Sequence, residues 1–406
     1  MSNEFKHMAV EGLDFYYLKD QILFAKFNGQ ELNQFLKVET QKTVFEFDPE
    51  QKENTIVSIS NEINNVIQVL CKAIKQLKDM NEHLSAAYLA TYCFQELTIY
   101  SEKIKNEGRY VHACYYWLKI ISLIYDGETK NYVQVHKGHP YYFLAFYYLL
   151  NGDIETGFIY AYNAIKEDEI IGKYCPELGY PQNAPIYLTV FLVDNRMNRM
   201  IAFVKEFRKD LNFLISSYNK GFTKNFSIQD FDKKFLQNES NINLEGTRYL
   251  FTFIFWSLEE LRRKNKPQIQ NNEFSKLRNL SWVFNLCLII DKILESNPHL
   301  GLENMGQNVE KLLTQHLRIL SKKDLEKAKE ECHWKKDPDE VLRFLLPMNL
   351  KIGSKELSNL AIHYLIAWRL RNYGGHEIQQ QKCLVENFDE IFQILMRCII
   401  SAVDLL

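Results

Sequence analysis

Glycine and proline are scarce in this chain, with 16 and 9 occurrences in 406 residues. Both residues interrupt helices, so their scarcity favours a predominantly helical protein. No Cys-x-x-Cys pair occurs, and most of the eight cysteines lie in apolar segments. This pattern predicts buried thiols in a reducing compartment and disfavours a zinc site.

Long apolar runs are also missing, because no uninterrupted stretch reaches the length of a bilayer span. The first 14 residues lack the basic and then apolar pattern of a signal peptide. We therefore expect a cytoplasmic protein with no membrane segment. The formal net charge of −2 gives no global attraction to polyanions, so any nucleic-acid binding must depend on local positive charge.

Several catalytic motifs are absent as well. The sequence contains no Gly-x-x-x-x-Gly-Lys-Ser/Thr loop, no Gly-x-Ser-x-Gly elbow and no His-Glu-x-x-His. These absences disfavour nucleotide hydrolysis at a phosphate-binding loop, serine-type hydrolysis and zinc-dependent proteolysis. We predict neither a metal nor a cofactor.

The composition is that of a chain with large cores, since 46% of the residues are hydrophobic. Residues 1–55 form the exception to the helical pattern. Ile22–Phe27 and Thr43–Phe47 are short strand-like runs bounded by Asn28-Gly29 and Asp48-Pro49. We predict a small β-ribbon in an N-terminal cap.

Residues 56–218 are expected to form paired helices. The stretch from Tyr147 to Gly157, with a tight Asn151-Gly152-Asp153 turn, resembles a tetratricopeptide-type repeat. In such repeats a small residue lets two helices pack closely, and stacked pairs expose a surface for a protein or peptide partner. A plain helical bundle is the alternative for this region.

Residues 219–245 are polar and are predicted to be a linker. Residues 246–406 are predicted to form a C-terminal helical bundle. The apolar spacing there indicates helices at 249–263, 274–295, 309–332 and 338–346, and two further helices around residue 374.

The hexapeptide Arg371-Asn372-Tyr373-Gly374-Gly375-His376 separates those last two helices. Apolar residues at helical spacing between Lys355 and Arg371 predict one helix, with Ser354 as its N-cap. The two glycines end it, and a second apolar helix follows from Leu384 to Val403. We therefore expect the Arg371 guanidinium and the His376 imidazole to lie close together. In the simpler alternative, Arg371 only satisfies carbonyls at a helix end.

The segment from Ala367 to His376 resembles the signature of the HEPN superfamily, which is an arginine, a polar residue, several others and a histidine. Arg371, Asn372 and His376 match it position by position, and the resemblance covers about the last third of the chain. It implies an endoribonuclease of the kind found in toxin–antitoxin, CRISPR and phage-defence systems. It also implies a homodimer in which both motifs face a shared cleft, although other members have lost catalysis.

The chemistry expected at such a site needs no metal, because the RNA 2′-hydroxyl is the nucleophile. Arg371 would hold the scissile phosphate, His376 would transfer a proton, and Asn372 would orient one of them. The products would be a 2′,3′-cyclic phosphate and a 5′-hydroxyl. Further RNA contacts are assigned to Arg369 and to a basic cluster whose alternative is a solvated helix end, namely Arg262, Arg263 and Lys264.

Three functions follow from these patterns. The favoured one is a metal-independent endoribonuclease of a prokaryotic defence or toxin system, with the N-terminal helical repeats as sensor. The second is a non-catalytic scaffold that dimerises through the C-terminal bundle. The third is a helical regulator that binds a small molecule or nucleotide.

Overall fold

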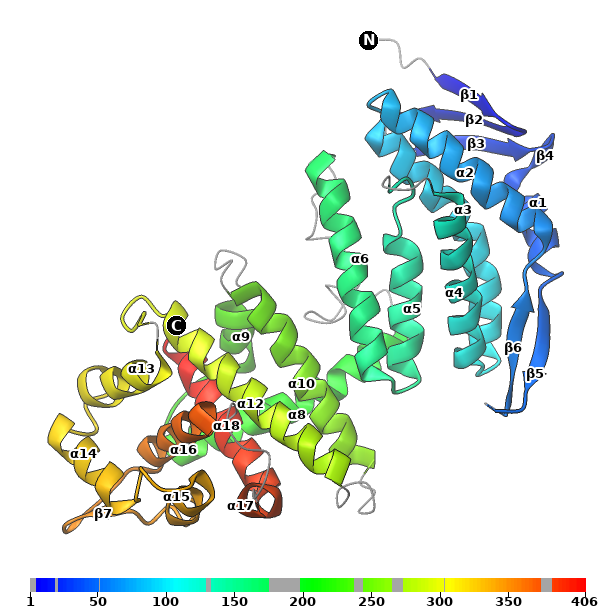
Figure 1. The fold of residues 1–406 in the computed structure, drawn as a ribbon. Coiled ribbons are helices and arrows are strands. Elements are labelled where there is room, and N and C mark those ends of the chain that lie inside the picture. The colour runs from blue at the N-terminus through cyan, green and yellow to red at the C-terminus, as the bar shows by residue number, and fades with distance from the viewer. Residues whose placement is uncertain are drawn as a thin grey trace. The chain divides into compact units, whose positions relative to one another are not determined.

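The protein is described from a computed structural model of the whole chain. The structure describes residues 5–18, 21–50, 52–128, 133–174, 198–236, 244–264, 273–302, 304–373 and 382–406. The chain divides into two compact units, Met1–Val204 and Lys205–Leu406. Most described residues are helical, and the first unit adds a small antiparallel sheet (Figure 1). The prediction of a mainly α protein with N-terminal strands is confirmed.

The first unit begins with strands and continues as a row of helices. Its strands are β1 (Lys6–Val10), β2 (Leu13–Leu18), β3 (Gln21–Phe27), β4 (Gln30–Glu31), β5 (Val44–Asp48) and β6 (Glu53–Ser58). Its helices are α1 (Leu32–Thr40), α2 (Asn61–Asp79), α3 (His83–Asn106), α4 (Tyr110–Gly127), α5 (Gly138–Leu150) and α6 (Ile154–Tyr174).

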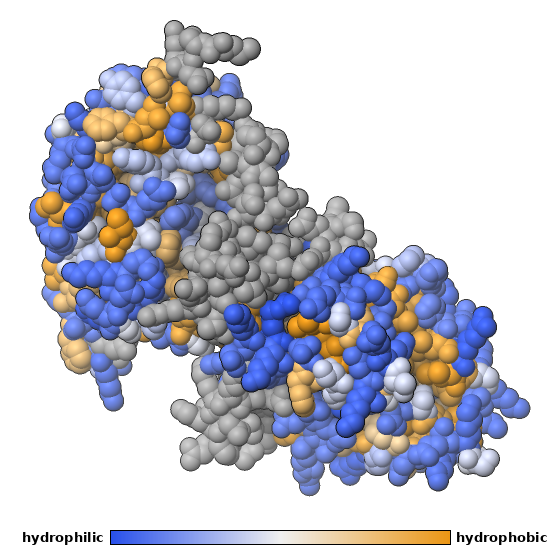
Figure 2. Space-filling view, turned by 180° about the vertical axis from the view of Figure 1, so that it is seen from behind, coloured by the Kyte–Doolittle hydropathy of each residue, from blue (hydrophilic) through white to orange (hydrophobic). Residues whose placement is uncertain are grey.

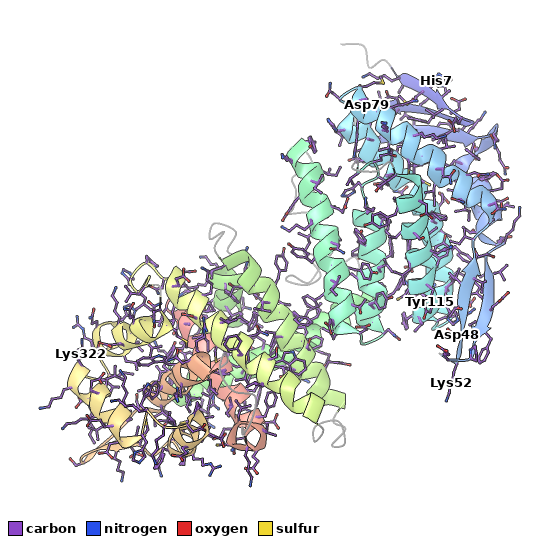
Figure 3. All side chains as sticks on the ribbon, viewed as in Figure 1. His7, Asp48, Lys52, Asp79, Tyr115 and Lys322 are labelled. Carbon is purple, nitrogen blue, oxygen red and sulfur yellow. The ribbon has the colours of Figure 1, made fainter. Side chains whose placement is uncertain are left out.

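The strands β1 to β4 form one antiparallel sheet in sequential order, with Phe15 opposite Ala25 on β3. Phe15 and Ala25 are both buried. Directly opposite residues of neighbouring strands point to the same face of a sheet, and here that face lies beneath the helices. The strands β5 and β6 form a separate hairpin, and Figure 3 labels Asp48 and Lys52 at its tip. The sequence predicted β3 and β5, but it did not indicate β1, β2, β4, β6 or α1.

The helices α2 to α6 stand side by side in Figure 1, and each packs against its neighbour in the chain. The turn between α5 and α6 is tight, since Gly152 has a φ of 81° and Asp153 Oδ1 accepts a bond from Thr156 N. Gly157 lies directly against Leu149, so that a Cβ at Gly157 would come 2.6 Å from Leu149 Cγ. A small residue therefore allows the close pairing of these two helices.

The connection between α4 and α5 is fastened by a buried lysine. Lys137 Nζ donates to Glu128 Oε1 at 3.0 Å and to the carbonyl of Val135 at 3.1 Å. Its backbone N–H donates to Glu167 Oε2 on α6 at 3.1 Å. The Lys137 side chain is only 3% exposed, and its charge is compensated by two carboxylates. This arrangement ties three consecutive helices together.

In its described residues, the second unit contains helices and one short β-hairpin. Its helices are α8 (Asn198–Phe222, within this unit from Lys205), α9 (Ile228–Phe231), α10 (Glu245–Lys264), α12 (Glu273–Ser296), α13 (Met305–Lys311), α14 (Lys322–Glu331), α15 (Pro338–Leu345), α16 (Asn359–Tyr373), α17 (Lys382–Glu386) and α18 (Phe388–Asp404). Its remaining elements are the π-helical turns η2 (Asp232–Leu236) and η4 (Leu312–His316) and the strands β7 (Lys351–Ile352) and β8 (Lys355–Glu356).

The core of this unit lies where α12, α16 and α18 pack against one another, with α10 against α12. Every residue of α16 from Ala361 to Ala367 is buried, so this helix is central and not amphipathic at its middle. Seven cysteines of the described residues are buried free thiols, four of them in this unit. The expectation that the thiols behave as buried apolar groups is confirmed for these residues.

The predicted linker at 219–245 differs from the structure over its described part. Phe231 and Phe235, on α9 and η2, are fully buried and contact Phe251 of α10 at ring distances of 5.6 Å and 5.5 Å. Arg208 and Asp232 form an ion pair of 2.5 Å beside them. Because these two aromatic side chains are buried, residues 223–236 belong to the packed unit. The polar composition of the segment obscured them in the sequence.

Two predicted helices are wrong in extent. The single helix expected at 309–332 is broken, because Arg318 has a φ of 52° and Ser321 starts a new helix with Asp324 as its capping-box partner. The helix expected from Lys355 begins instead at Asn359, where Ser358 Oγ accepts a bond from Ala361 N. Lys355 pairs with Ile352 in the β7–β8 hairpin.

The surfaces of both units are mixed. Hydrophilic residues predominate on the face drawn in Figure 2, with smaller hydrophobic areas between them. None of the described helices combines the length and the apolar character needed to cross a bilayer.

Candidate functional site

Arg371 lies in the last turn of α16, where that helix leaves the core. The preceding residues of α16 are buried against α12 and α18, and Leu370 is 3% exposed. The side chain of Arg371 is 33% exposed. The structure therefore places this guanidinium at the edge of the helical core, where it is partly exposed.

One edge of the Arg371 guanidinium is held by α12. Its Nε donates to Asp291 Oδ2 at 3.2 Å, and its Cζ lies 5.4 Å from the ring centroid of Phe284. Among the described residues, no partner is found for its two terminal nitrogens. A guanidinium anchored through Nε keeps its outer edge available for a second acceptor, such as a pair of phosphate oxygens.

The carboxyl group of Asp291 is unusual because it is half-buried. Burial raises its pKa above the ordinary range for aspartate, and the nearby Arg371 guanidinium offsets part of that rise. Cys287, one turn earlier on α12, is fully buried, and burial raises the pKa of its thiol. Of the α12 residues described beside Arg371, Phe284 and Cys287 are apolar, and Asp291 supplies the charge.

Asn372 follows Arg371 on α16 and is exposed. His376 lies outside the described residues, so its distance from Arg371 stays a prediction. Of the three predicted catalytic residues, the structure describes Arg371 and Asn372, which are consecutive residues near the C-terminal end of α16.

The described structure resumes at α17, and hydrogen bonds to the N-terminus of this helix hold it in place. The backbone N–H groups of Cys383 and Leu384 donate to the carboxylate of Asp339, at distances from 2.9 Å to 3.4 Å. Asp339 is 8% exposed and also accepts a bond from Arg343 at 3.3 Å. A carboxylate at a helix N-terminus satisfies donors that have no partner in the helix itself.

The predicted RNA-contacting residues lie at different places. Arg369, also on α16, points to another side of the helix, where its Nη2 donates to the carbonyl of Lys336 at 2.7 Å. Arg262, Arg263 and Lys264 form the last turn of α10, but their side chains lie outside the described part. Arg369 and Arg371 therefore contact different neighbours, although they lie two residues apart on α16.

Sequence reasoning missed Asp291 and Asp339. Asp291 had one available signal, because it is an acid within the apolar helix at 274–295, and such residues are commonly paired. Asp339 sits in the first turn of α15, where an acid is expected in any helix, so its contact with α17 had no local signal. In the part of the chain that the structure describes, no three His, Cys, Asp or Glu side chains are grouped so as to hold a metal ion.

Comparison of the chain with protein-family models, with curated proteins and with solved structures gives no match. The assignment of a function therefore depends on the residues of α16, on the partners that hold them and on the resemblance of the hexapeptide.

Proposed function

We propose that the chain is a metal-independent endoribonuclease of the HEPN type. The observation that carries the proposal is the partly exposed Arg371, held through its Nε by Asp291 and in contact with the ring of Phe284. An arginine whose position is fixed on one edge costs little further ordering when its other edge binds a phosphate.

In this proposal Arg371 binds the phosphate at which the chain is cleaved. Its charge stabilises the negative charge that grows on the phosphate oxygens in the transition state. His376 moves the proton of the 2′-hydroxyl or of the leaving 5′-oxygen, and Asn372 orients one of these groups by a hydrogen bond. The 2′-oxygen forms the new bond to phosphorus as the bond to the 5′-oxygen breaks.

The wider biology is part of the same proposal. RNA is the substrate, two copies pair through the C-terminal bundle, and the first unit senses a protein or peptide partner. The setting is a cytoplasmic defence or toxin–antitoxin system of a prokaryote. Pairing would place two arginines in one cleft, which overcomes the formal net charge of −2 on each chain.

The first test compares the purified protein with two variants, Arg371→Ala and His376→Ala, on assorted single-stranded RNAs in EDTA. We expect cleavage that resists EDTA, leaves a 2′,3′-cyclic phosphate and falls at least about a hundredfold in either variant. Arg318→Ala, which changes an exposed arginine elsewhere in the same unit, is the control. Equal cleavage in all four proteins would show that the activity belongs to a contaminant.

A second candidate is a scaffold without catalysis. The ion pair between Arg371 and Asp291 favours it, because such a pair also serves a purely structural arginine at a helix end. In that case Arg371→Ala would lower the melting temperature, and no condition would reveal cleavage of RNA.

A further inference from the structure

The hairpin of β5 and β6 has an open edge. The two strands form a sheet of their own, and none of the described residues adds a third strand to it. β6 packs against α4, and Figure 1 shows β5 on the outer side of the hairpin, farther from that helix. An edge strand presents backbone N–H and C=O groups with which a further strand can pair. The outer side of β5 therefore offers its backbone to an extended chain.

The sequence of β5 lacks the usual protection of such an edge. Edge strands are commonly blunted by lysine, by proline or by being very short. β5 reads Val44-Phe45-Glu46-Phe47-Asp48, which is five residues with three apolar side chains and neither lysine nor proline. Val44 is 45% exposed and Phe47 is 63% exposed. The bulge in the pairing with β6 lies between Val44 and Phe45, so the rest of the strand is regular.

The two faces of β5 differ in chemistry, because alternate residues of a strand point to opposite faces. Phe45 and Phe47 share one face. The Phe45 ring lies against the start of α4, where the Arg109 guanidinium carbon is 5.0 Å from its centroid. Phe47 follows towards the tip of the hairpin. Glu46 and Asp48 share the other face. One face of this edge is therefore apolar and the other is acidic.

The acidic face carries a charge imbalance. From Val44 to Ser58 the sequence contains four acids and one lysine. Glu46 is exposed, and none of the described residues forms an ion pair with its carboxylate. Lys42, which precedes the strand, is engaged by Glu39 at 2.6 Å. The hairpin therefore attracts a chain with basic side chains on the matching face.

We propose that the outer edge of β5 is a docking site for an extended segment of a partner protein in which basic and apolar residues alternate. The segment adds a strand to the hairpin through backbone hydrogen bonds. Its apolar residues lie beside Phe47 and its lysines or arginines beside Glu46, because neighbouring strands share their faces. This inference rests on the proposed function only where the first unit senses a partner, and not on the ribonuclease chemistry.

The test uses the full-length protein and a short fluorescein-labelled peptide of alternating lysine and valine, with fluorescence anisotropy giving the Kd. A peptide of the same composition, repeated in the order Lys-Lys-Val-Val, has the same charge but cannot place its lysines on one face of a strand. The alternating peptide should bind at least about tenfold more tightly than the paired-order peptide. A peptide of alternating glutamate and valine should not bind.

Two variants test the residues of the edge. Glu46→Lys replaces attraction by repulsion at the middle of β5 and should weaken binding roughly tenfold. Phe47→Thr removes the exposed ring, keeps a residue that favours strands and should weaken binding roughly threefold. The matched control is Asp126→Lys, which makes the same change of charge at an exposed position near the other end of α4 from Arg109. It should leave the Kd unchanged.

A further readout needs no variant of the protein, so it holds even if a substitution prevents folding. The N–H groups of every second residue lie along one edge of a strand. N-methylation of all valines or of all lysines therefore blocks one edge of the peptide. One of these two methylated peptides should lose binding and the other should keep it, as pairing along a single edge requires.

Equal binding of the alternating and paired-order peptides would overturn the proposal, as would a Kd that ignores Glu46→Lys. Absence of peptide binding, with self-association of the protein that Phe47→Thr abolishes, would assign the edge to a second copy and also overturn it. Its failure is distinct from that of the proposed nuclease. RNA cleavage without peptide binding would remove this site alone, and peptide binding without RNA cleavage under any condition would remove the nuclease alone.

Discussion

At the scale of single residues, the partner of Arg371 matters as much as Arg371 itself. A guanidinium on a long side chain samples many rotamers, and Asp291 and Phe284 remove most of that freedom before any ligand arrives. Asp291 is therefore proposed as a positioning residue, because it acts through Arg371 and does not contact RNA.

Asp291→Ala should lower RNA cleavage by roughly ten- to a hundredfold while the melting temperature changes little. A misplaced arginine loses transition-state contacts, whereas a partly exposed ion pair contributes only about 0–1 kcal/mol to stability. Asp291→Asn keeps an acceptor oxygen and should retain more activity. Glu295→Ala, one turn further along α12, is the control, and equal losses in both alanine variants would rule out a specific role.

A buried histidine in the first unit predicts a dependence of stability on pH. Burial lowers the pKa of His139 to about 4. Its Nε2 shares a hydrogen bond with Thr98 Oγ1 at 3.2 Å. Because the unfolded value is about 6.5, the neutral ring stabilises the fold above that pH, and this contribution is lost as pH falls towards 4. The loss amounts to about 3 kcal/mol.

The measurement is thermal unfolding between pH 7 and pH 4.5 for the wild type and for His139→Gln. The variant starts from a lower melting temperature, but its melting temperature should fall less over this range. A parallel decline in the two proteins would contradict the assignment to His139.

At the scale of elements, the close contact between α5 and α6 can be tested with one methyl group. Gly157→Ala should destabilise the protein by about 1–3 kcal/mol, because the new Cβ meets Leu149 and the two helices must move apart. Gly221→Ala is the counterpart on α8, where nothing lies within 4 Å of the added atom. It should stabilise by about 0.5–1 kcal/mol, since alanine favours the helix. Chemical denaturation measures both, and equal signs for the two substitutions would contradict this account.

The sequence predicted most elements because their apolar residues recur at helical spacing. The failures came from features that this spacing does not encode. A break at Arg318 depends on a backbone conformation, and a capping box at Ser321 with Asp324 lay inside a segment that still looked periodic. Likewise, Phe231 and Phe235 were hidden in a polar stretch, and only tertiary packing shows that they are core residues.

At the candidate site too, the sequence predicted the local features and missed the contacts that depend on tertiary packing. A short local pattern was enough to select Arg371 and Asn372, since α16 and its end are local features. Asp291 lies 80 residues earlier in the chain than Arg371. Its proximity to α16 follows from the packing of α12, which a local pattern does not specify.

At the scale of the whole molecule, the proposed nuclease requires two copies. Sedimentation velocity should give a mass of about twice the 48.1 kDa of one chain. Dilution that separates the copies should abolish cleavage in parallel. Activity that is proportional to the protein concentration well below the dissociation point would show that one copy is sufficient.

The buried Lys137 offers a way to observe the first unit directly. Its amine is enclosed by Glu128, Glu167 and the Val135 carbonyl, so amine-reactive reagents cannot reach it while these contacts persist. Mass spectrometry of the labelled peptide would then report how often the link between α4 and α5 opens. If binding of a partner loosens this link, the rate of acylation at one lysine will rise while exposed lysines react as before.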